Sequence, residues 1–278
     1  IKGLGSGGGG PVVVTCSENG SMCLRAMDES LSEIATEDER EIKGPVSRFA
    51  VSPLNDHIAY GGNENEAQVM CLETGKVIWK AKNVPNNFLD LRLPVWVTDL
   101  QYMPGEDQRK VAVCTAYGQV RLYDIRAQHR PVVNAVVTEV SEQIRLADGT
   151  RLTTLSVCEL EPTWCVVGDA MGGIRKVDLR TGNVFGKFKH MVGSVRGVSL
   201  HATQNYMAAA GLDRYTRVYD TKSMKVVSEV YMKQRLTSLL FSVDEKVAKP
   251  KEKKHFFEKR GGEGDEEEDA EWLGMKRA

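Results

Sequence analysis

Side chains that could bind a metal or act as nucleophiles are present in this chain, but they are scattered. The five histidines are His57, His129, His190, His201 and His255. The six cysteines form no Cys-x-x-Cys pair and are Cys16, Cys23, Cys71, Cys114, Cys158 and Cys165. A zinc site needs clustered ligands, so we expect no metal site. We interpret the cysteines as reduced, buried thiols in or beside strands.

No familiar catalytic arrangement is visible either. The sequence lacks a Ser-His-Asp order, a His-Glu-x-x-His motif, a paired-carboxylate arrangement and a Walker sequence. The glycine-rich stretch 5–10 has no Lys-Ser or Lys-Thr after its glycines, so we interpret it as a flexible surface loop. We therefore predict no enzyme: no catalytic residues, no cofactor and no small-molecule substrate.

Composition limits the partners. The chain has 278 residues, of which 41% are hydrophobic, enough to bury a sizeable core. Its 37 basic and 38 acidic side chains give a formal charge of −1, which argues against bulk electrostatic capture of nucleic acid and still allows a local basic face. No apolar run approaches the ~18–20 residues of a membrane helix and no secretory signal is visible, so we expect no membrane partner.

The strongest signal for the fold is a repeated phrase. Ala-Tyr-Gly-Gln-Val-Arg-Leu-Tyr-Asp is its clearest copy, and all copies combine turn-forming residues with alternating apolar and polar positions. The copies begin at Glu18, Asn65, Ala116, Ala170 and Leu212, at intervals of 42 to 54 residues. Periods of about 40 to 50 residues built from short strands are typical of a β-propeller, with one four-stranded blade per repeat. We predict an all-β fold.

The strands of each blade can be assigned from the repeat. First strands are expected at 48–53, 99–104 and 195–201, and fourth strands at 76–80 and 184–188. Second strands, rich in small or β-branched residues, are expected at 12–15, 58–61, 111–115, 165–168 and 207–211. The repeated phrase itself is the third strand. Residues 236–242 look like the first strand of one more blade. A seven-bladed ring would need over about 300 residues, so we expect roughly two further blades before Ile1.

Two polar residues connect the fifth repeat with the WD40 class of propeller. His190 precedes a first strand, Asp213 lies in the turn between second and third strands, and Tyr219-Asp220 stands where that class has Trp-Asp. In that class the equivalent His and Asp bond to each other within a blade. We expect His190 and Asp213 to be structural and to share a hydrogen bond. Ala209 or Ala210 replaces the Ser of that network.

The composition changes after the last repeat. Residues 249–260 hold six basic side chains against two acidic ones, and residues 265–269 are all acidic. With so little apolar content, we predict a mostly disordered tail over 244–278 and a propeller over 1–243. The basic stretch is either a nuclear-localisation or nucleic-acid patch or simply a solvated tail. The apolar cluster of Trp272, Leu273 and Met275 is typical of a short docking motif.

The segment 81–96, AKNVPNNFLDLRLPVW, is too long for a simple connection between blades. Together with AYGQVRLYD from Ala116, GSVRGVSLH from Gly193 and AAGLDRYTRVYD from Ala209, it resembles the nucleolar WD-repeat assembly factors of the large ribosomal subunit. The resemblance covers about 81–242. The chain departs from that family in lacking the opening blades and in a longer insertion at 139–151.

The resemblance implies a non-catalytic, seven-bladed scaffold in ribosome biogenesis. Its partners would be pre-60S assembly factors and pre-ribosomal RNA, an AAA-type ATPase would release it, and it would act in the nucleolus and nucleus. The alternative is a WD40 adaptor of another nuclear complex, as a ubiquitin-ligase receptor or a chromatin reader.

Loops on a rigid scaffold often carry function, so the long segment is the candidate docking surface. Asn amides and an Arg fork can bind backbone or phosphate acceptors, and Trp and Arg are common interface hot spots. The predicted partner-binding residues are Asn83, Asn86, Asn87, Arg92 and Trp96, extended by Arg196 and Arg214. In the alternative interpretation, Phe88, Leu91 and Trp96 only hold the loop onto its own propeller.

Overall fold

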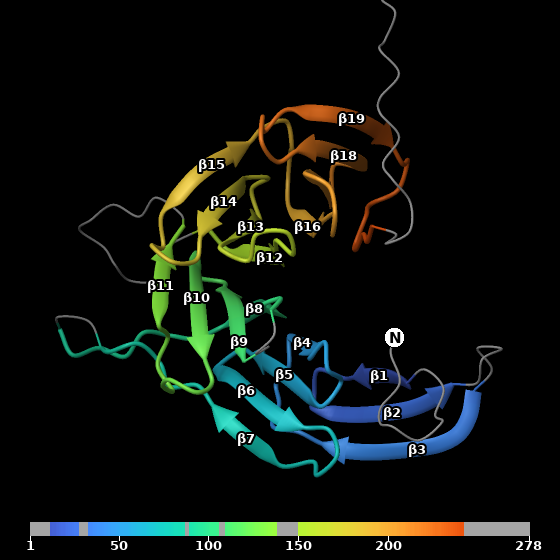
Figure 1. Cartoon of the computed structure of the whole chain (residues 1–278), viewed down its shortest axis with the longest axis vertical. Helices are drawn as coiled ribbons and strands as arrows, with labels where there is room; N and C mark the ends of the chain where they lie inside the picture. Colours follow the sequence, from blue (N-terminus) through green and yellow to red (C-terminus); the bar gives the residue numbers. More distant parts are fainter. Residues whose placement is uncertain (1–11, 28–32, 87–88, 106–108, 138–149, 242–278) are drawn as a thin grey trace, which may run out of the picture. The chain divides into compact units, whose positions relative to one another are not determined.

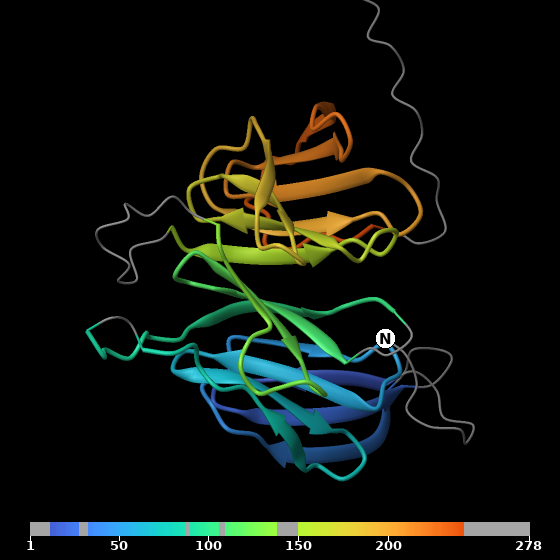
Figure 2. The ribbon, with the colours of Figure 1, turned by 60° about the vertical axis from the view of Figure 1, so that its left-hand side comes forward.

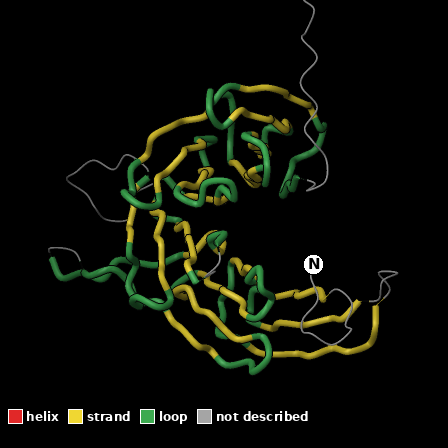
Figure 3. The backbone as a smooth tube through the Cα atoms, viewed as in Figure 1, coloured by secondary structure: helices red, strands yellow, loops and turns green. Residues whose placement is uncertain are grey.

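A computed structural model describes residues 12–27, 33–86, 89–105, 109–137 and 150–241 of the chain. These residues form 19 β-strands joined by turns and loops, without a helix (Figure 3). The predicted all-β fold is therefore confirmed. Contacts divide the chain into two units, Ile1–Lys246 and Val247–Ala278, and every described residue belongs to the first. The predicted tail at 244–278 and the stretch 5–10 lie outside the described residues.

The strands pair antiparallel in chain order into five sheets (Figure 1). The first sheet has three strands: β1 (Val12–Cys16), β2 (Ser21–Met27) and β3 (Glu33–Glu41). The second has β4 (Arg48–Val51), β5 (His57–Gly62), β6 (Asn65–Cys71) and β7 (Val77–Lys80). The third has β8 (Val97–Tyr102), β9 (Lys110–Thr115), β10 (Gln119–Asp124) and β11 (Val133–Val136). The fourth has β12 (Leu152–Val157), β13 (Trp164–Asp169), β14 (Ile174–Asp178) and β15 (Val184–Phe188). The fifth has β16 (Val195–Leu200), β17 (Tyr206–Gly211), β18 (Tyr215–Asp220) and β19 (Val226–Tyr231).

These sheets are WD40-type blades, and the repeated phrase forms the third strand of each four-stranded sheet, as predicted, and the middle strand, β2, of the three-stranded first sheet. Its regularity has a backbone cause, since the turn into that strand needs a residue with positive φ. Gly20, Gly118 and Gly172 take this position with φ of 100°, 71° and 96°, a conformation that glycine adopts without steric cost. The number of blades in the whole protein stays a prediction.

The extra first strand predicted at 236–242 is wrong for the described residues 236–241, which form no strand. They lie beside the fifth sheet instead: the Leu236 amide donates to the carbonyl of Gly211 in β17 at 3.3 Å, and the Phe241 ring contacts His201, directly after β16, at a centroid distance of 5.2 Å. A strand requires a hydrogen-bonded partner ladder, and the described residues provide none for this segment. Ser242 lies outside them.

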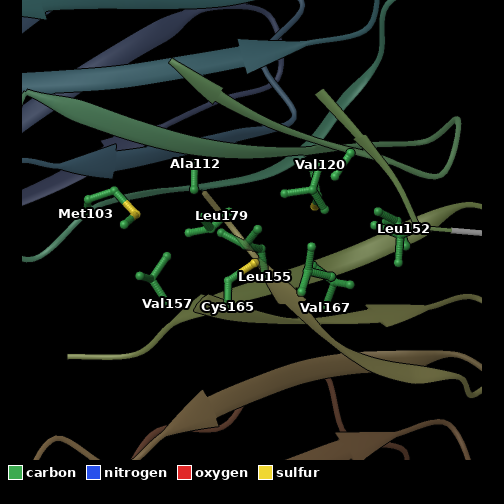
Figure 4. Close-up of a cluster of buried hydrophobic side chains, with 13 residues drawn as sticks. Met103, Ala112, Val120, Leu152, Leu155, Val157, Cys165, Val167 and Leu179 are labelled. Atoms are coloured by element: carbon green, nitrogen blue, oxygen red, sulfur yellow. The ribbon is translucent and has the colours of Figure 1, made fainter. Parts of the chain in front are cut away.

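The hydrophobic cores lie between sheets rather than inside any one of them. Four clusters of buried side chains join the first to the second sheet, the second to the third, the third to the fourth, and the fourth to the fifth. Figure 4 shows the cluster between the third and fourth sheets, where Ala112 and Val120 face Leu155 and Val167. Each inner sheet therefore shares a core with both of its neighbours.

Polar bonds between first strands fix the sheets further. The Asp99 carboxylate on β8 accepts the Leu155 amide of β12 at 2.9 Å, and the Gln101 side-chain oxygen accepts the Val157 amide at 2.8 Å. The Ser156 hydroxyl of β12 accepts the Leu200 amide of β16 at 3.2 Å. Figure 2 shows these sheets stacked one after another. They form a rigid base for the connections at their ends.

Candidate docking surface

The described parts of segment 81–96 protrude from the sheets between β7 and β8 (Figures 1 and 2). The two ends of the segment are held by backbone bonds. At the start, the Ala81 amide donates to the Ala67 carbonyl at 2.8 Å. At the end, the Glu64 amide donates to the Val95 carbonyl at 2.8 Å, and Trp96 forms a β-bridge with Asn63. The segment is thus a loop with fixed ends.

Asn83 holds the loop from inside. Its amide nitrogen donates to the Leu93 carbonyl at 2.6 Å, which ties the two arms of the loop together. Its oxygen accepts Nη1 of Arg121 at 3.2 Å and the Val84 amide at 2.9 Å. The Arg121 side chain is only 2% exposed and also donates to Gln119. Because the Asn83 amide is used within the chain, its described role is to anchor the loop.

The outer part of the loop is held by its own polar contacts. The Asn86 amide donates to the carboxylate of Asp90 at 2.8 Å and to the Asp90 carbonyl at 3.2 Å. Arg92 is 62% exposed and pairs with Glu64 at 3.1 Å. An ion pair this exposed contributes little to stability, about 0 to 1 kcal/mol. The Arg92 guanidinium is therefore free in energetic terms to exchange Glu64 for a partner. Asn87 and Phe88 lie outside the described residues.

Trp96 makes two contacts with distant parts of the chain. It is half-buried, its carbonyl accepts the Ala116 amide at 2.9 Å, and the Arg151 guanidinium lies 4.2 Å above its ring. A cation held over an indole ring stabilises by about 0.5 to 2 kcal/mol. Trp96 and Arg151 thereby connect the entry to β8 with the entry to β12.

Arg196 and Arg214 are both exposed and belong to the fifth sheet. Arg196 is the extra residue where β16 shifts register against β17, between Val195 and Gly197, and Arg214 lies in the turn from β17 to β18. Both lie at the same end of the sheets as segment 81–96. Val195 pairs with Gly211 where β16 begins and β17 ends, and Val97, directly after the segment, pairs with Thr115 where β8 begins and β9 ends. No described contact joins these two arginines to the loop. The partner-binding role of the predicted set stays a prediction.

The expected hydrogen bond between His190 and Asp213 is replaced by another pair. The Asp213 carboxylate accepts the Tyr215 amide at 3.2 Å and forms a close ion pair with Arg217, whose other nitrogen contacts Glu229 at 2.9 Å. Asp213 is 8% exposed and Arg217 is 7% exposed. His190 is exposed, with a backbone φ of 81°. A guanidinium from the adjacent strand satisfies the buried carboxylate better than an imidazole exposed to solvent.

The arginines of the third strands are structural side chains that the sequence analysis did not single out. An Arg stands three residues before the closing acid of four third strands, at Arg25, Arg121, Arg175 and Arg217. Arg175 pairs with the buried Asp169 at 2.7 Å, which resembles the Arg217–Asp213 pair. The recurrence of Arg in register with the repeated phrase is the signal that could have identified them.

The described residues contain neither a cluster of metal ligands nor a membrane-spanning helix. No group of three His, Cys, Asp or Glu side chains within them could hold a metal ion. The same part of the chain contains no helix with the length and apolar character needed to cross a membrane.

Comparison with known proteins gives a consistent set of relatives. No protein-family model matches the chain. WD repeat-containing protein 74 of Bos taurus is 35% identical over 236 residues, which cover 83% of this chain and 57% of that protein. Its Mus musculus counterpart is 34% identical, covering 87% of this chain and 60% of that protein. Ribosome biogenesis protein NSA1 of Meyerozyma guilliermondii is 28% identical, covering 71% of this chain and 55% of that protein.

The chain thus spans less than two thirds of the length of these relatives. The matches agree with the repeat, with the blade-like sheets and with the motif-based resemblance. The chain belongs to the family of WD-repeat proteins represented by WD repeat-containing protein 74 and ribosome biogenesis protein NSA1.

Proposed function

We propose that this protein is a non-catalytic scaffold of ribosome biogenesis that docks on nucleolar pre-60S particles through segment 81–96. The observation that carries the proposal is the loop itself: both of its ends are fixed, while Arg92 is exposed in a weak ion pair. A docking element benefits from such a rigid base, because less conformational entropy is lost on binding. The name of the NSA1 relatives, ribosome biogenesis protein, supports the process.

The partners follow from the same proposal. They are pre-60S assembly factors and pre-ribosomal RNA, with an AAA-type ATPase acting in release. The site of action is the nucleolus and nucleus, and the basic stretch 249–260 would assist nuclear entry.

The first prediction concerns Arg92. Reversing its charge with Arg92→Glu should weaken association with large-subunit precursors about tenfold, because losing an interface arginine costs on the order of 1–2 kcal/mol. The measurement is sedimentation of the tagged protein in sucrose gradients, with precursor RNA detected in the same fractions. The thermal midpoint should stay within about 2 °C of wild type, since the lost ion pair is exposed.

Arg180→Glu is the matched control. Arg180 is also an exposed arginine paired with a nearby acid, Asp178 at 3.5 Å, but it lies in the turn between β14 and β15. If both variants sediment like wild type, the loop is not the docking surface. If the wild-type protein instead co-purifies with a cullin or with histones, the adaptor alternative replaces the scaffold.

A further inference from the structure

A basic cavity lies at the border of the fourth and fifth sheets, away from segment 81–96. Its volume is about 500 Å³, and it is lined by Lys187, Lys189, His190, Ser223, Met224, Lys225 and Val226. Three lysines and a histidine therefore face one space, and no carboxylate is among the lining side chains. The nearest acid of that turn, Asp220, accepts the Ser223 hydroxyl at 2.9 Å and the Lys222 amide at 2.9 Å. We name this cavity the lysine pocket.

The lysine pocket is built on a fixed backbone. Met224 packs directly over Gly186 of β15, where an added Cβ would come within 2.4 Å of the Met224 methyl group. The buried Tyr219 donates its hydroxyl to the Lys189 carbonyl at 2.8 Å. Next to it, His190 keeps a left-handed φ of 81°, a conformation that costs a non-glycine residue about 1–3 kcal/mol and is concentrated at binding sites. The basic side chains thus start from fixed positions.

We propose that the lysine pocket binds backbone phosphates of single-stranded RNA. Lys189 and Lys225 provide point charges suited to phosphate oxygens. An exposed aromatic side chain on the same strand favours nucleic acid over an acidic peptide: Phe185, two residues before Lys187 on β15, is 49% exposed, and the Lys176 ammonium lies 5.0 Å from its ring centroid. Basic grooves with adjacent aromatic side chains bind single strands by pairing charge with base stacking. This inference rests on the proposed function, because it assumes that the protein works on an RNA-containing particle.

The test measures binding of a fluorescent 20-nucleotide polyuridine RNA across a series of salt concentrations. The pocket variant is Lys189→Gln with Lys225→Gln, and the control is Lys43→Gln with Lys110→Gln, two lysines exposed elsewhere. Each phosphate contact contributes about 0.7 to the slope of log affinity against log salt for single strands. The pocket variant should therefore lower the slope by about 1.4 and the affinity roughly 25-fold at 0.1 M salt. The control should match wild type.

Each outcome decides the proposal. Equal losses in the two variants would show bulk electrostatic attraction and overturn it. A loss of binding to a poly-glutamate peptide, with RNA binding unchanged, would make the pocket a site for an acidic protein and also overturn it. Sedimentation of the wild-type protein is scored separately: its absence from large-subunit precursors contradicts the proposed function, whereas the RNA titration judges the pocket alone.

Discussion

Arg214 occupies a backbone position that three of the other sheets give to glycine and the second sheet gives to Glu64, with φ of 49°. In the turns between second and third strands, Gly20, Gly118 and Gly172 hold a positive φ, and Arg214 holds φ of 69° at the equivalent place. The left-handed conformation costs a non-glycine residue about 1–2 kcal/mol. The arginine side chain is exposed, and no described contact of this side chain offsets the cost of the left-handed backbone. Such a disadvantage is consistent with selection for binding rather than for folding.

Arg214→Gly should therefore stabilise the protein and weaken its association with large-subunit precursors. We expect a gain of about 0.5–1 kcal/mol in the free energy of unfolding, because relief of the left-handed strain exceeds the entropy that glycine adds to the unfolded chain. Denaturant titration measures it. Arg196→Gly is the control, since Arg196 does not have a positive φ, and glycine there should cost about 0.5–1 kcal/mol. Loss of stability in Arg214→Gly would remove the argument.

Glu66 gives a pH-dependent prediction. Its side chain is 11% exposed, Nη1 of Arg121 lies 4.0 Å from one oxygen, and neither oxygen accepts a hydrogen bond from the described residues. Burial raises the pKa of Glu66, while the nearby Arg121, Arg92 and Lys80 oppose the rise and Glu64 adds to it. A raised pKa means that the folded protein takes up this proton more readily than the unfolded chain.

The stability linked to Glu66 is therefore complete below the unfolded pKa of about 4.3 and is lost as pH rises through the folded pKa. Glu66→Gln keeps the shape and removes this loss. The variant should exceed wild type in free energy of unfolding at pH 7, and the difference should shrink toward zero near pH 4. Denaturant titrations at both pH values measure it. A difference independent of pH would show that ionisation of Glu66 is not the cause.

At the scale of elements, Arg217 of β18 connects the turn before it with β19 after it. It pairs with the buried Asp213 and with Glu229, which is 43% exposed. Asp213→Ala should cost about 3–5 kcal/mol, since it leaves a buried guanidinium without its main partner. Glu229→Ala should cost at most about 1 kcal/mol because that pair is exposed to solvent. Thermal or denaturant unfolding separates the two, and equal costs would contradict this division.

His190→Ala completes the comparison. The exposed imidazole makes no described bond to Asp213, so this substitution should not reproduce the loss. In the sequence, His190 and Asp213 stood at the positions of a known pair, and nothing in that spacing indicated that Arg217 would pair with Asp213. Asp213 and Arg217 lie in a turn and in the strand that follows it, so their pair can form locally. The exposed His190 side chain would instead have to point inward from the connection before β16 to reach the carboxylate.

The strands differ in how well the sequence predicts them. Second and third strands carry dense β-branched residues or the repeated phrase, and all were found. The outer strands β7 and β15 were also predicted, whereas the outer strands β3, β11 and β19 and the buried first strand β12 were not assigned. The sequence of β3, EIATEDERE, has almost no apolar alternation, because an outer strand borders solvent and needs few buried side chains. The hydrophobic pattern therefore does not identify a polar outer strand such as β3.

At the scale of the whole molecule, the repeat predicted the succession of sheets but not the role of each loop residue. Segment 81–96 stands out by length and composition. Yet Asn83 and Trp96, chosen as binding residues, make internal contacts that depend on Arg121 and Arg151, far away in the sequence. Contacts of that range arise only after the sheets assemble. Among the residues predicted to bind a partner in this segment, Arg92 has a side chain that is exposed and carries a charge suited to binding.

The position of the cores between sheets also affects how the chain is made on the ribosome. A sheet that has just left the exit tunnel has one apolar face without a partner until the next repeat, 42 to 54 residues later, has followed it. Synthesis proceeds at about 5–20 residues per second, so each face stays uncovered for roughly 2 to 11 seconds. During that interval the nascent chain exposes valine-rich strands to the crowded cytosol. Chaperone demand during translation would thus recur with the period of the repeat.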